Sequence, residues 1–305
     1  MKKNLGHYGL VALKGIAMGA ADVVPGVSGG TIAFIAGIYD ELIDSIKSVN
    51  LANLKLLFTG KFRAFWKAVN GNFLLSLIVG IGISIFSLAR VITVLLHEYP
   101  VLVFAFFFGL IVASAWFVSR DIREWNWKTV SGLIVGIVLA VWVTSVTAAQ
   151  TPETLWFVFL CGFVAICAMI LPGISGSFIL LLMGKYEYIL AAVKNLDAAV
   201  LGMFAVGAVV GITSFARLLS FALRRFRAMT LAVLTGFIIG SLNKVWPWKE
   251  TVQSYVDSHG VEKPLVESNI LPDAFVWQAV LLMLAGFFLV WGLERLSGRK
   301  PAERK

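Results

Sequence analysis

The sequence Val23-Val24-Pro25-Gly26-Val27-Ser28-Gly29-Gly30-Thr31 interrupts an otherwise apolar region with one proline, three glycines and two hydroxyl side chains. A related segment, Leu171-Pro172-Gly173-Ile174-Ser175-Gly176-Ser177, follows at an offset of 147 residues. Between positions 25 and 48, eight residues are identical to their partners at this offset, including Gly37 with Gly184, Tyr39 with Tyr186 and Lys47 with Lys194. We therefore expect the chain to be organised around two copies of one element, the first break (residues 23–31) and the second break (residues 171–177).

The composition is typical of a polytopic membrane protein. Hydrophobic residues make up 59% of the chain, charged residues 14%, and the mean hydropathy is +0.88. The net charge of +9 does not predict nucleic-acid binding, because the basic residues gather in short loops, where they set membrane orientation. No cleavable signal peptide is expected. Cys161 and Cys167 lie in an apolar run and are expected in the core, so no disulfide, metal site or cofactor is predicted.

Apolar arms flank each break, at 8–24 and 31–46 and again at 154–171 and 178–193. A full crossing needs about 20 residues, so these short arms predict re-entrant helical hairpins, which enter and leave the membrane on the same side. Three full spans follow each hairpin. They are expected at 73–96, 101–119 and 129–148, and at 198–223, 228–245 and 274–293. The predicted fold is an all-α, integral membrane domain of two repeats, residues 1–149 with hairpin 8–48 and residues 150–305 with hairpin 154–194.

Three crossings and a hairpin give each repeat odd parity, which predicts that the second copy is inverted relative to the first. At an offset of 127, identical pairs continue through the spans: Gly80/Gly207, Ser87/Ser214, Ala89/Ala216, Arg90/Arg217, Leu96/Leu223, Gly109/Gly236, Ile111/Ile238 and Ser114/Ser241. Lys and Arg fall in the segments that inversion places inside, whereas the outer loop 246–273 holds two lysines against five acidic residues. Both termini are therefore predicted to be cytoplasmic. Inverted repeats with broken helices are typical of secondary transporters.

The breaks are predicted to bind an anion. A helix that begins inside the membrane presents unpaired N–H groups and the positive end of its dipole. Glycines let the backbone approach an oxyanion, and serine and threonine add hydroxyl donors. The predicted phosphate-binding residues of the breaks are Gly26, Ser28, Gly29, Gly30, Thr31, Gly173, Ser175, Gly176 and Ser177. The alternative is a glycine-rich packing hinge whose serines cap their own helices.

Arg90 and Arg217 complete the predicted phosphate site. An arginine in the middle of a span costs about 2.5–3.5 kcal/mol on insertion scales, so two at equivalent positions call for compensation. A guanidinium fork facing the site would hold phosphate through two hydrogen bonds, and inversion would place one such site in each leaflet. Alternatively, both side chains snorkel to headgroups.

Three further residues are candidates for coupling or gating. Asp22 precedes the first break and has Met169 at its equivalent position, so it lies outside the repeat symmetry. It is interpreted either as a proton relay or as the partner of Lys14 or of an arginine. Tyr39 and Tyr186 are interpreted either as gates or as interfacial anchors.

The segment Gly15-Ile16-Ala17-Met18-Gly19-Ala20-Ala21-Asp22, continued by the first break, and Ile170 with the second break resemble the paired motifs of the bacterial polyprenyl-phosphate transporter family. The resemblance runs essentially end to end. It implies a multi-pass flippase of the bacterial cytoplasmic membrane that moves undecaprenyl phosphate from the outer to the inner leaflet, which recycles the carrier lipid of cell-envelope synthesis. The implied partner is the polyprenyl-phosphate lipid in the bilayer, and no enzymatic activity is implied. The sequence predicts no oligomeric state.

Two alternatives remain at this point. Undecaprenyl-pyrophosphate phosphatases are similar in their inverted repeats and a Pro-Gly-x-Ser element, but they carry an arginine directly after the serine, where this chain has Gly29 and Gly176. Their glutamate-rich motif has no convincing counterpart near residues 40–44. The other alternative is a transporter of a small anion, which would need no prenyl tail for binding.

Overall fold

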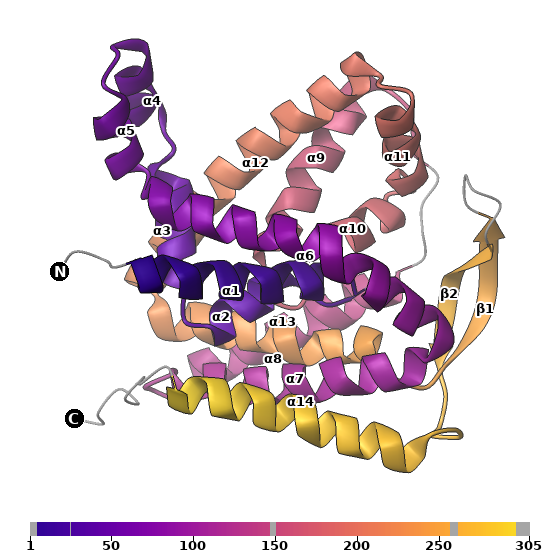
Figure 1. The fold of residues 1–305 in the computed structure, drawn as a ribbon. Helices are drawn as coiled ribbons and strands as arrows, with labels where there is room; N and C mark the ends of the chain where they lie inside the picture. Colours follow the sequence, from indigo (N-terminus) through magenta and orange to yellow (C-terminus); the bar gives the residue numbers. More distant parts are fainter. Residues whose placement is uncertain (1–4, 25, 147–150, 257–261, 297–305) are drawn as a thin grey trace.

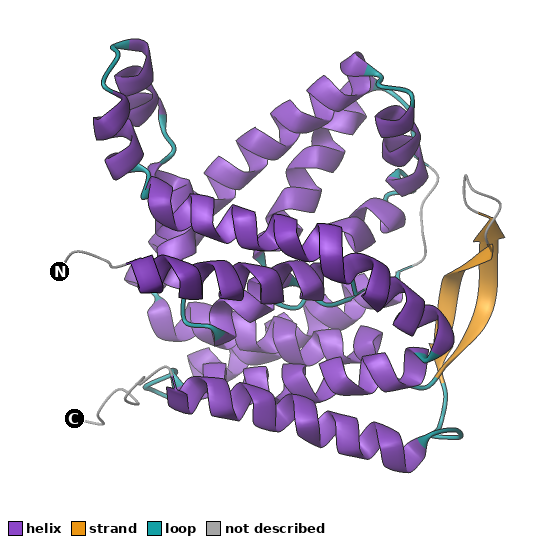
Figure 2. Cartoon of the chain, in the orientation of Figure 1, coloured by secondary structure: helices purple, strands orange, loops and turns teal. Residues whose placement is uncertain are grey.

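The computed structural model describes residues 5–24, 26–146, 151–256 and 262–296, and these are mostly helical (Figure 2). The first half contains α1 (Leu5–Asp22), α2 (Gly29–Ile35), α3 (Tyr39–Ser48), α4 (Leu51–Phe58), α5 (Phe62–Ala68), α6 (Gly71–Glu98), α7 (Pro100–Arg120) and α8 (Trp127–Ser145). The second half contains α9 (Leu155–Ile170), α10 (Gly176–Leu182), α11 (Tyr186–Lys194), α12 (Ala198–Arg225), α13 (Arg227–Val245), β1 (Lys249–Val256), β2 (Glu262–Asn269) and α14 (Val276–Leu296).

Five of the described helices, α6, α7, α8, α12 and α13, are long and apolar enough to cross a membrane. The pair α10 and α11 would add a sixth candidate as one broken span, although the two helices are bent by 109°. Since α6 and α12 each have 28 residues, they are about 42 Å long. That exceeds the roughly 30 Å hydrocarbon thickness of a bilayer, and tilting accommodates the excess. The protein is a helical, multi-pass membrane protein, as the composition predicted.

The second arm of each predicted hairpin, at 31–46 and at 178–193, consists of two helices rather than one. A turn separates α2 from α3, and another separates α10 from α11. Gly37 and Gly184 occupy these turns with φ of 70° and 61°, a region where glycine avoids the steric penalty of a Cβ. The identity of these two glycines was therefore the sequence signal for the second bend.

The prediction of an all-α fold misses a two-stranded antiparallel sheet. β1 and β2 form it within the loop 246–273, and β1 is rich in the β-branched and aromatic residues that favour strands. Its base is tied to the bundle because the indole N–H groups of Trp246 and Trp248 donate to the carbonyls of Ile270 and Ala274, at 2.9 and 2.8 Å.

Helix packing follows the correspondence between the repeats. α1 packs on α6 while α9 packs on α12, and α7 packs on α14 while α13 packs on α8 (Figure 1). Small residues allow these close crossings. A Cβ at Gly80 would overlap the carbonyl oxygen of Ala12, and one at its equivalent Gly207 would overlap that of Phe159. Gly109 and Gly236 have the same role at the α7–α14 and α13–α8 crossings.

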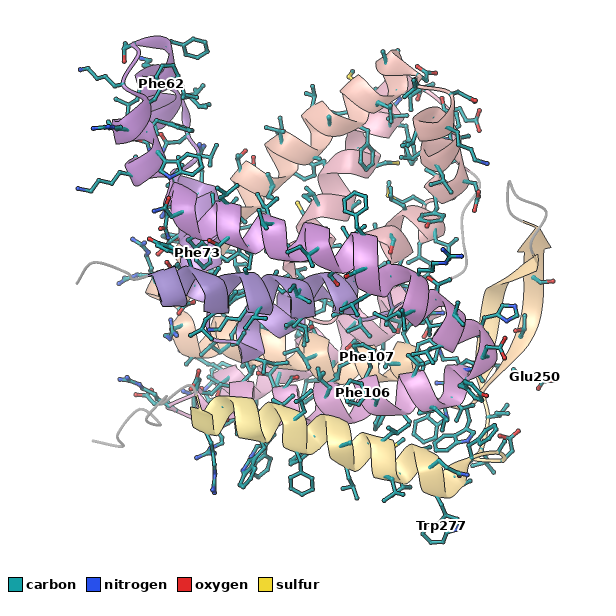
Figure 3. The ribbon with its side chains drawn as sticks, viewed as in Figure 1. Phe62, Phe73, Phe106, Phe107, Glu250 and Trp277 are labelled. Carbon is teal, nitrogen blue, oxygen red and sulfur yellow. The ribbon has the colours of Figure 1, made fainter. Side chains whose placement is uncertain are left out.

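The two ends of the bundle differ. The start of α1 and the end of α14 lie at one end, and the β1–β2 hairpin extends from the other (Figure 1). The α4–α5 hairpin projects from the first end and carries Phe62 away from the bundle, whereas Trp277 points outward at the second end (Figure 3). Phe73 and Phe107 lie in the core.

Candidate functional site

The two breaks meet in the interior of the protein. The Ser28 hydroxyl lies 3.2 Å from the carbonyl oxygens of both Met169 and Leu171 and donates toward them. In the other direction, the backbone N–H of Gly173 donates to Oγ1 of Thr31 at 2.9 Å. The structure therefore brings the predicted residues of the first break against the backbone of the second.

Polar groups of the first break are engaged by protein partners. The N–H of Gly29 donates to a carboxylate oxygen of Asp22 at 2.6 Å, and the N–H of Gly30 donates to the Ser28 hydroxyl at 3.0 Å. Ser28 is 1% exposed and Thr31 is fully buried. The alternative interpretation, a serine that caps its own helix, thus describes Ser28 correctly.

The second break is open by comparison. Ser175, the N-cap of α10, makes no capping hydrogen bond, and its hydroxyl pairs with that of Ser177 at 2.8 Å. Ser177 is exposed. Met169, 40% exposed, stands where the first repeat has the carboxylate of Asp22. Among the described residues, no side chain accepts from the first-turn N–H groups of α10, although Ser175 itself is only 5% exposed.

Glycine shapes both breaks. Gly26 and Gly173 have φ of 83° and 89°, so the two turns share one backbone conformation. A Cβ at Gly30 would lie 2.7 Å from the carbonyl oxygen of Ile170, and one at Gly176 would lie 2.7 Å from that of Ala165. These glycines permit close backbone packing, which is part of the role predicted for them. Pro25 lies outside the described residues.

Arg90 and Arg217 lie on α6 and α12, the helices that pack against α1 and α9. Both side chains are exposed, and neither makes a hydrogen bond or an ion pair with any part of the chain that the structure describes. The structure records no contact between either guanidinium and a break. Their assignment to the phosphate site therefore stays a prediction.

The two tyrosines have different surroundings. Tyr39, at the start of α3, is 2% exposed and donates to the carbonyl of Ile170 at 3.1 Å, so it adds a third link between the two repeats, directly before the second break. This burial rules out an interfacial anchor at Tyr39. Tyr186 is half-buried and packs beside Cys161. Lys14, the suggested partner of Asp22, donates to the carbonyl of Ala36 at the end of α2, at 2.7 Å.

A charged lock joins α3 to α12 and α13 near the first end of the bundle. Asp44 accepts two hydrogen bonds from Arg224, each of 2.9 Å, and Asp40 pairs with Arg227 at 3.1 Å. The equivalent of Asp44 in the second repeat is Ala191. Helix α11 accordingly makes its main contacts with α10 and α12 of its own repeat.

The sequence analysis missed a cluster of Lys244, Lys249 and Glu267 beneath the β1–β2 hairpin. Glu267 lies 2.8 Å from Nζ of Lys244 and 3.3 Å from Nζ of Lys249. Burial lowers the pKa of Lys249 to about 8, although Glu267 opposes this shift. Burial acts to raise the pKa of Glu267, but the two ammonium groups outweigh it and hold that pKa below its usual value. The sequence feature that could have predicted this cluster is Lys244, which lies at the end of an apolar span and next to a loop rich in acidic residues.

The cysteines are free, and Cys161 is buried, as predicted for core residues. Cys167 lies half-buried with its sulfur 3.6 Å from the carbonyl of Gly211. In the described residues, no group of three or more His, Cys, Asp or Glu side chains could hold a metal ion.

Comparison with known proteins gives the family. Residues 18–263 match the model of the VCA0040-like family, described as undecaprenyl phosphate translocase-like. The chain belongs to this family. It is 46% identical over 300 residues to a polyprenyl-phosphate transporter of Vibrio cholerae serotype O1, an alignment that covers 95% of this chain and 97% of the relative. It is 32% identical over 253 residues to a polyprenyl-phosphate transporter of Staphylococcus aureus, covering 77% and 85% of the two chains. No solved structure matches the chain.

Membership of the undecaprenyl phosphate translocase-like family confirms the resemblance that the two break motifs predicted. It also groups the chain with transporters rather than with the lipid phosphatases considered as an alternative.

Proposed function

We propose that this protein is a flippase that moves undecaprenyl phosphate from the outer to the inner leaflet of the bacterial cytoplasmic membrane, with both termini in the cytoplasm. The observation that carries the proposal is the second break. There, among the described residues, the Ser175 and Ser177 hydroxyls pair with each other, and no side chain accepts from the first N–H groups of α10. A phosphate oxyanion is the ligand that such donors favour.

The phosphate headgroup and the prenyl tail of the substrate suit different parts of the protein. The phosphate headgroup needs donors and cations shielded from hydrocarbon, because an isolated charge in the membrane is costly. The prenyl tail is as apolar as the lipid and can stay in the bilayer beside α6 and α12, whose outer faces are lined with exposed apolar side chains. We assign Arg90 and Arg217 to the path of the headgroup on these same helices, with Gly173 and Gly176 shaping the backbone that receives it.

In this proposal the repeats, residues 1–149 and 150–305, are inverted relative to each other, and each contributes a re-entrant broken hairpin. The exchanged helix pairs and the meeting of the breaks in the interior support it. The first break, with Asp22, Thr31 and Tyr39, acts as an anchor that holds the second in place. The α3–α12 lock closes the cytoplasmic end, and transport requires it to open.

The test is leaflet-resolved movement of undecaprenyl phosphate in proteoliposomes, with phosphate release followed in the same sample. Wild type is compared with Arg90→Ala, with Arg217→Ala and with the double variant Ser175→Ala/Ser177→Ala. The matched control is Ser87→Ala, because this hydroxyl is exposed on α6 and donates only to its own helix.

We expect movement without phosphate release in wild type and in the control, and at least a tenfold loss in the other variants, since each removes a donor to a charged group worth about 1.5–3 kcal/mol. Full activity in all three site variants would refute the assigned site. Release of phosphate in a parallel sample that contains undecaprenyl pyrophosphate would refute the transporter itself.

A further inference from the structure

Lys244 lies where three parts of the protein converge. A Cβ built at Gly26 of the first break would lie 2.9 Å from Cγ of Lys244, so the lysine stem rests on that turn. The ammonium group lies 5.3 Å from the ring centroid of Phe178, in the first turn of α10. The same nitrogen pairs with Glu267 of the β1–β2 hairpin. One cation thus lies beside the first break, the first turn of α10 and the β1–β2 hairpin.

Lys249 adds a second cation from the hairpin itself. Its ammonium group lies 4.4 Å from the ring centroid of Phe104 and donates to the carbonyl of Lys244 at 2.6 Å. Only 8% of its side chain is exposed, compared with 18% for Lys244 and 19% for Glu267. Burial of charges is costly unless they are paired, and here two ammonium groups share one carboxylate. The cluster keeps an excess positive charge close to the second break.

We propose that Lys244 and Lys249 form a receptor site for the phosphate headgroup of the substrate at the β1–β2 end of the bundle, with Glu267 as an exchangeable counter-anion. This inference rests on the proposed function and names where the headgroup first binds. A phosphate monoester carries a charge of about −1.5 to −2 and three acceptor oxygens, so it matches two ammonium groups better than one carboxylate does. Lysine binds phosphate as a point charge.

The arrangement also gives the headgroup a route. Phe178, whose ring lies beneath the Lys244 ammonium group, directly follows Ser177, the exposed hydroxyl of the second break. A phosphate held by Lys244 would therefore lie beside α10, the helix whose first residues carry the donors assigned above. Glu267 occupies the cations when substrate is absent, and the substrate displaces this carboxylate when it binds.

Binding to the purified full-length protein in nanodiscs tests the proposal. The probes are radiolabelled undecaprenyl phosphate and, separately, inorganic phosphate as a competitor. The variants are Glu267→Gln, Lys244→Gln, Lys249→Gln and the double variant Lys244→Gln/Glu267→Gln. Glu250→Gln is the matched control, because Glu250 lies on the same hairpin, is exposed, and points away from the bundle (Figure 3).

We expect Glu267→Gln to tighten lipid binding about threefold to tenfold, because it removes the internal competitor, and each lysine variant to weaken binding about tenfold. The double variant Lys244→Gln/Glu267→Gln should not show the tighter binding of Glu267→Gln. The control Glu250→Gln should bind the lipid as wild type does. Competition by millimolar inorganic phosphate would show that the headgroup alone is recognised, whereas its failure to compete would show that the lipid is required.

A Glu267→Gln variant that weakens binding as the lysine variants do would overturn the proposal, because the cluster would then be a structural ion pair. Unchanged binding in both lysine variants would overturn it equally. Thermal unfolding of each variant separates loss of fold from loss of site. If wild type binds with the expected pattern but does not move the lipid between leaflets, the proposed function fails and the receptor site stands. If lipid movement and binding are both normal in the lysine variants, only the receptor site fails.

Discussion

The two breaks share a backbone and differ in what their polar groups do. Gly26 and Gly173 have nearly the same φ, and serine follows each at the same spacing. In the first break, Asp22 and Ser28 accept from the N–H groups of Gly29 and Gly30, and the hydroxyl of Ser28 reaches into the other repeat. In the second, among the residues that the structure describes, the hydroxyls of Ser175 and Ser177 pair with each other and no side chain caps α10. The two repeats thus share the backbone turn. The surrounding side chains hydrogen-bond the first break to the rest of the protein, and they make fewer such bonds with the second break.

The largest expected effect comes from Asp22, whose carboxylate has no equivalent in the second repeat. Asp22→Ala leaves the N–H of Gly29 without an acceptor in a buried place, so we expect it to lower the free energy of unfolding by about 2–3 kcal/mol. Met169→Ala, at the equivalent position, should cost no more than about 1 kcal/mol, because that side chain is partly exposed. Thermal unfolding in detergent measures both. Equal losses of stability in the two variants would contradict the statement that the first break is more tightly bonded than the second.

The serines give the next contrast. Ser28→Ala removes a helix cap and the bonds to Met169 and Leu171, so we expect a loss of about 1–2 kcal/mol. Ser175→Ala should cost less, at most about 1 kcal/mol, because Ser175 caps no N–H group and its hydroxyl pairs only with that of Ser177 among the described residues. The same unfolding measurement checks both, and a larger loss for Ser175→Ala would contradict the comparison.

A smaller effect is expected for the tyrosines. Tyr39→Phe removes the hydrogen bond to Ile170, which is worth about 1 kcal/mol net, and leaves the ring packed. Tyr186→Phe removes no hydrogen bond that the structure records, and we expect it to match wild type. Urea titration of both variants, reconstituted in the same detergent, distinguishes these outcomes. Indistinguishable midpoints would show that the third link between the repeats is weak.

The smallest effect on stability is expected at the α3–α12 lock. Asp44→Asn weakens a pair whose side chains are 49% and 66% exposed, and such exposed ion pairs contribute at most about 1 kcal/mol. We expect little change in unfolding but a severalfold change in the rate of lipid movement, because the pair has to open in each cycle. The control is Arg225→Gln, an exposed neighbour of Arg224. A rate equal to that of wild type would show that the lock does not gate transport.

Part of this architecture follows from the sequence, because its causes are local. The spans are apolar runs of membrane length, and a Pro-Gly-Gly element inside such a run has to interrupt the helix. The offset identities locate equivalent positions, and Gly80 and Gly207 indeed serve equivalent crossings. The family was predicted from the same motifs and is confirmed.

The remaining features depend on contacts between distant segments. The capping of Gly29 by Asp22 requires the chain to turn back on itself, and no periodicity encodes it. Similarly, Lys244 and Glu267 are 23 residues apart and meet because the loop 246–273 folds into a sheet. The sequence therefore could not predict which break has its N–H groups capped by side chains. The one sequence difference that bears on it is Asp22, which has Met169 at the equivalent position.

The crossed hydrogen bonds between the breaks also affect how the protein is made. Ser28 and Thr31 find their partners 141 to 143 residues later in the chain. At general rates of synthesis of about 5–20 residues per second, those partners emerge roughly 7–28 s after the first break. The hydrocarbon core offers no water to stand in for them meanwhile. The first break is thus synthesised early but forms its final hydrogen bonds late. Until then, the polar groups of this segment have to be shielded from the hydrocarbon core.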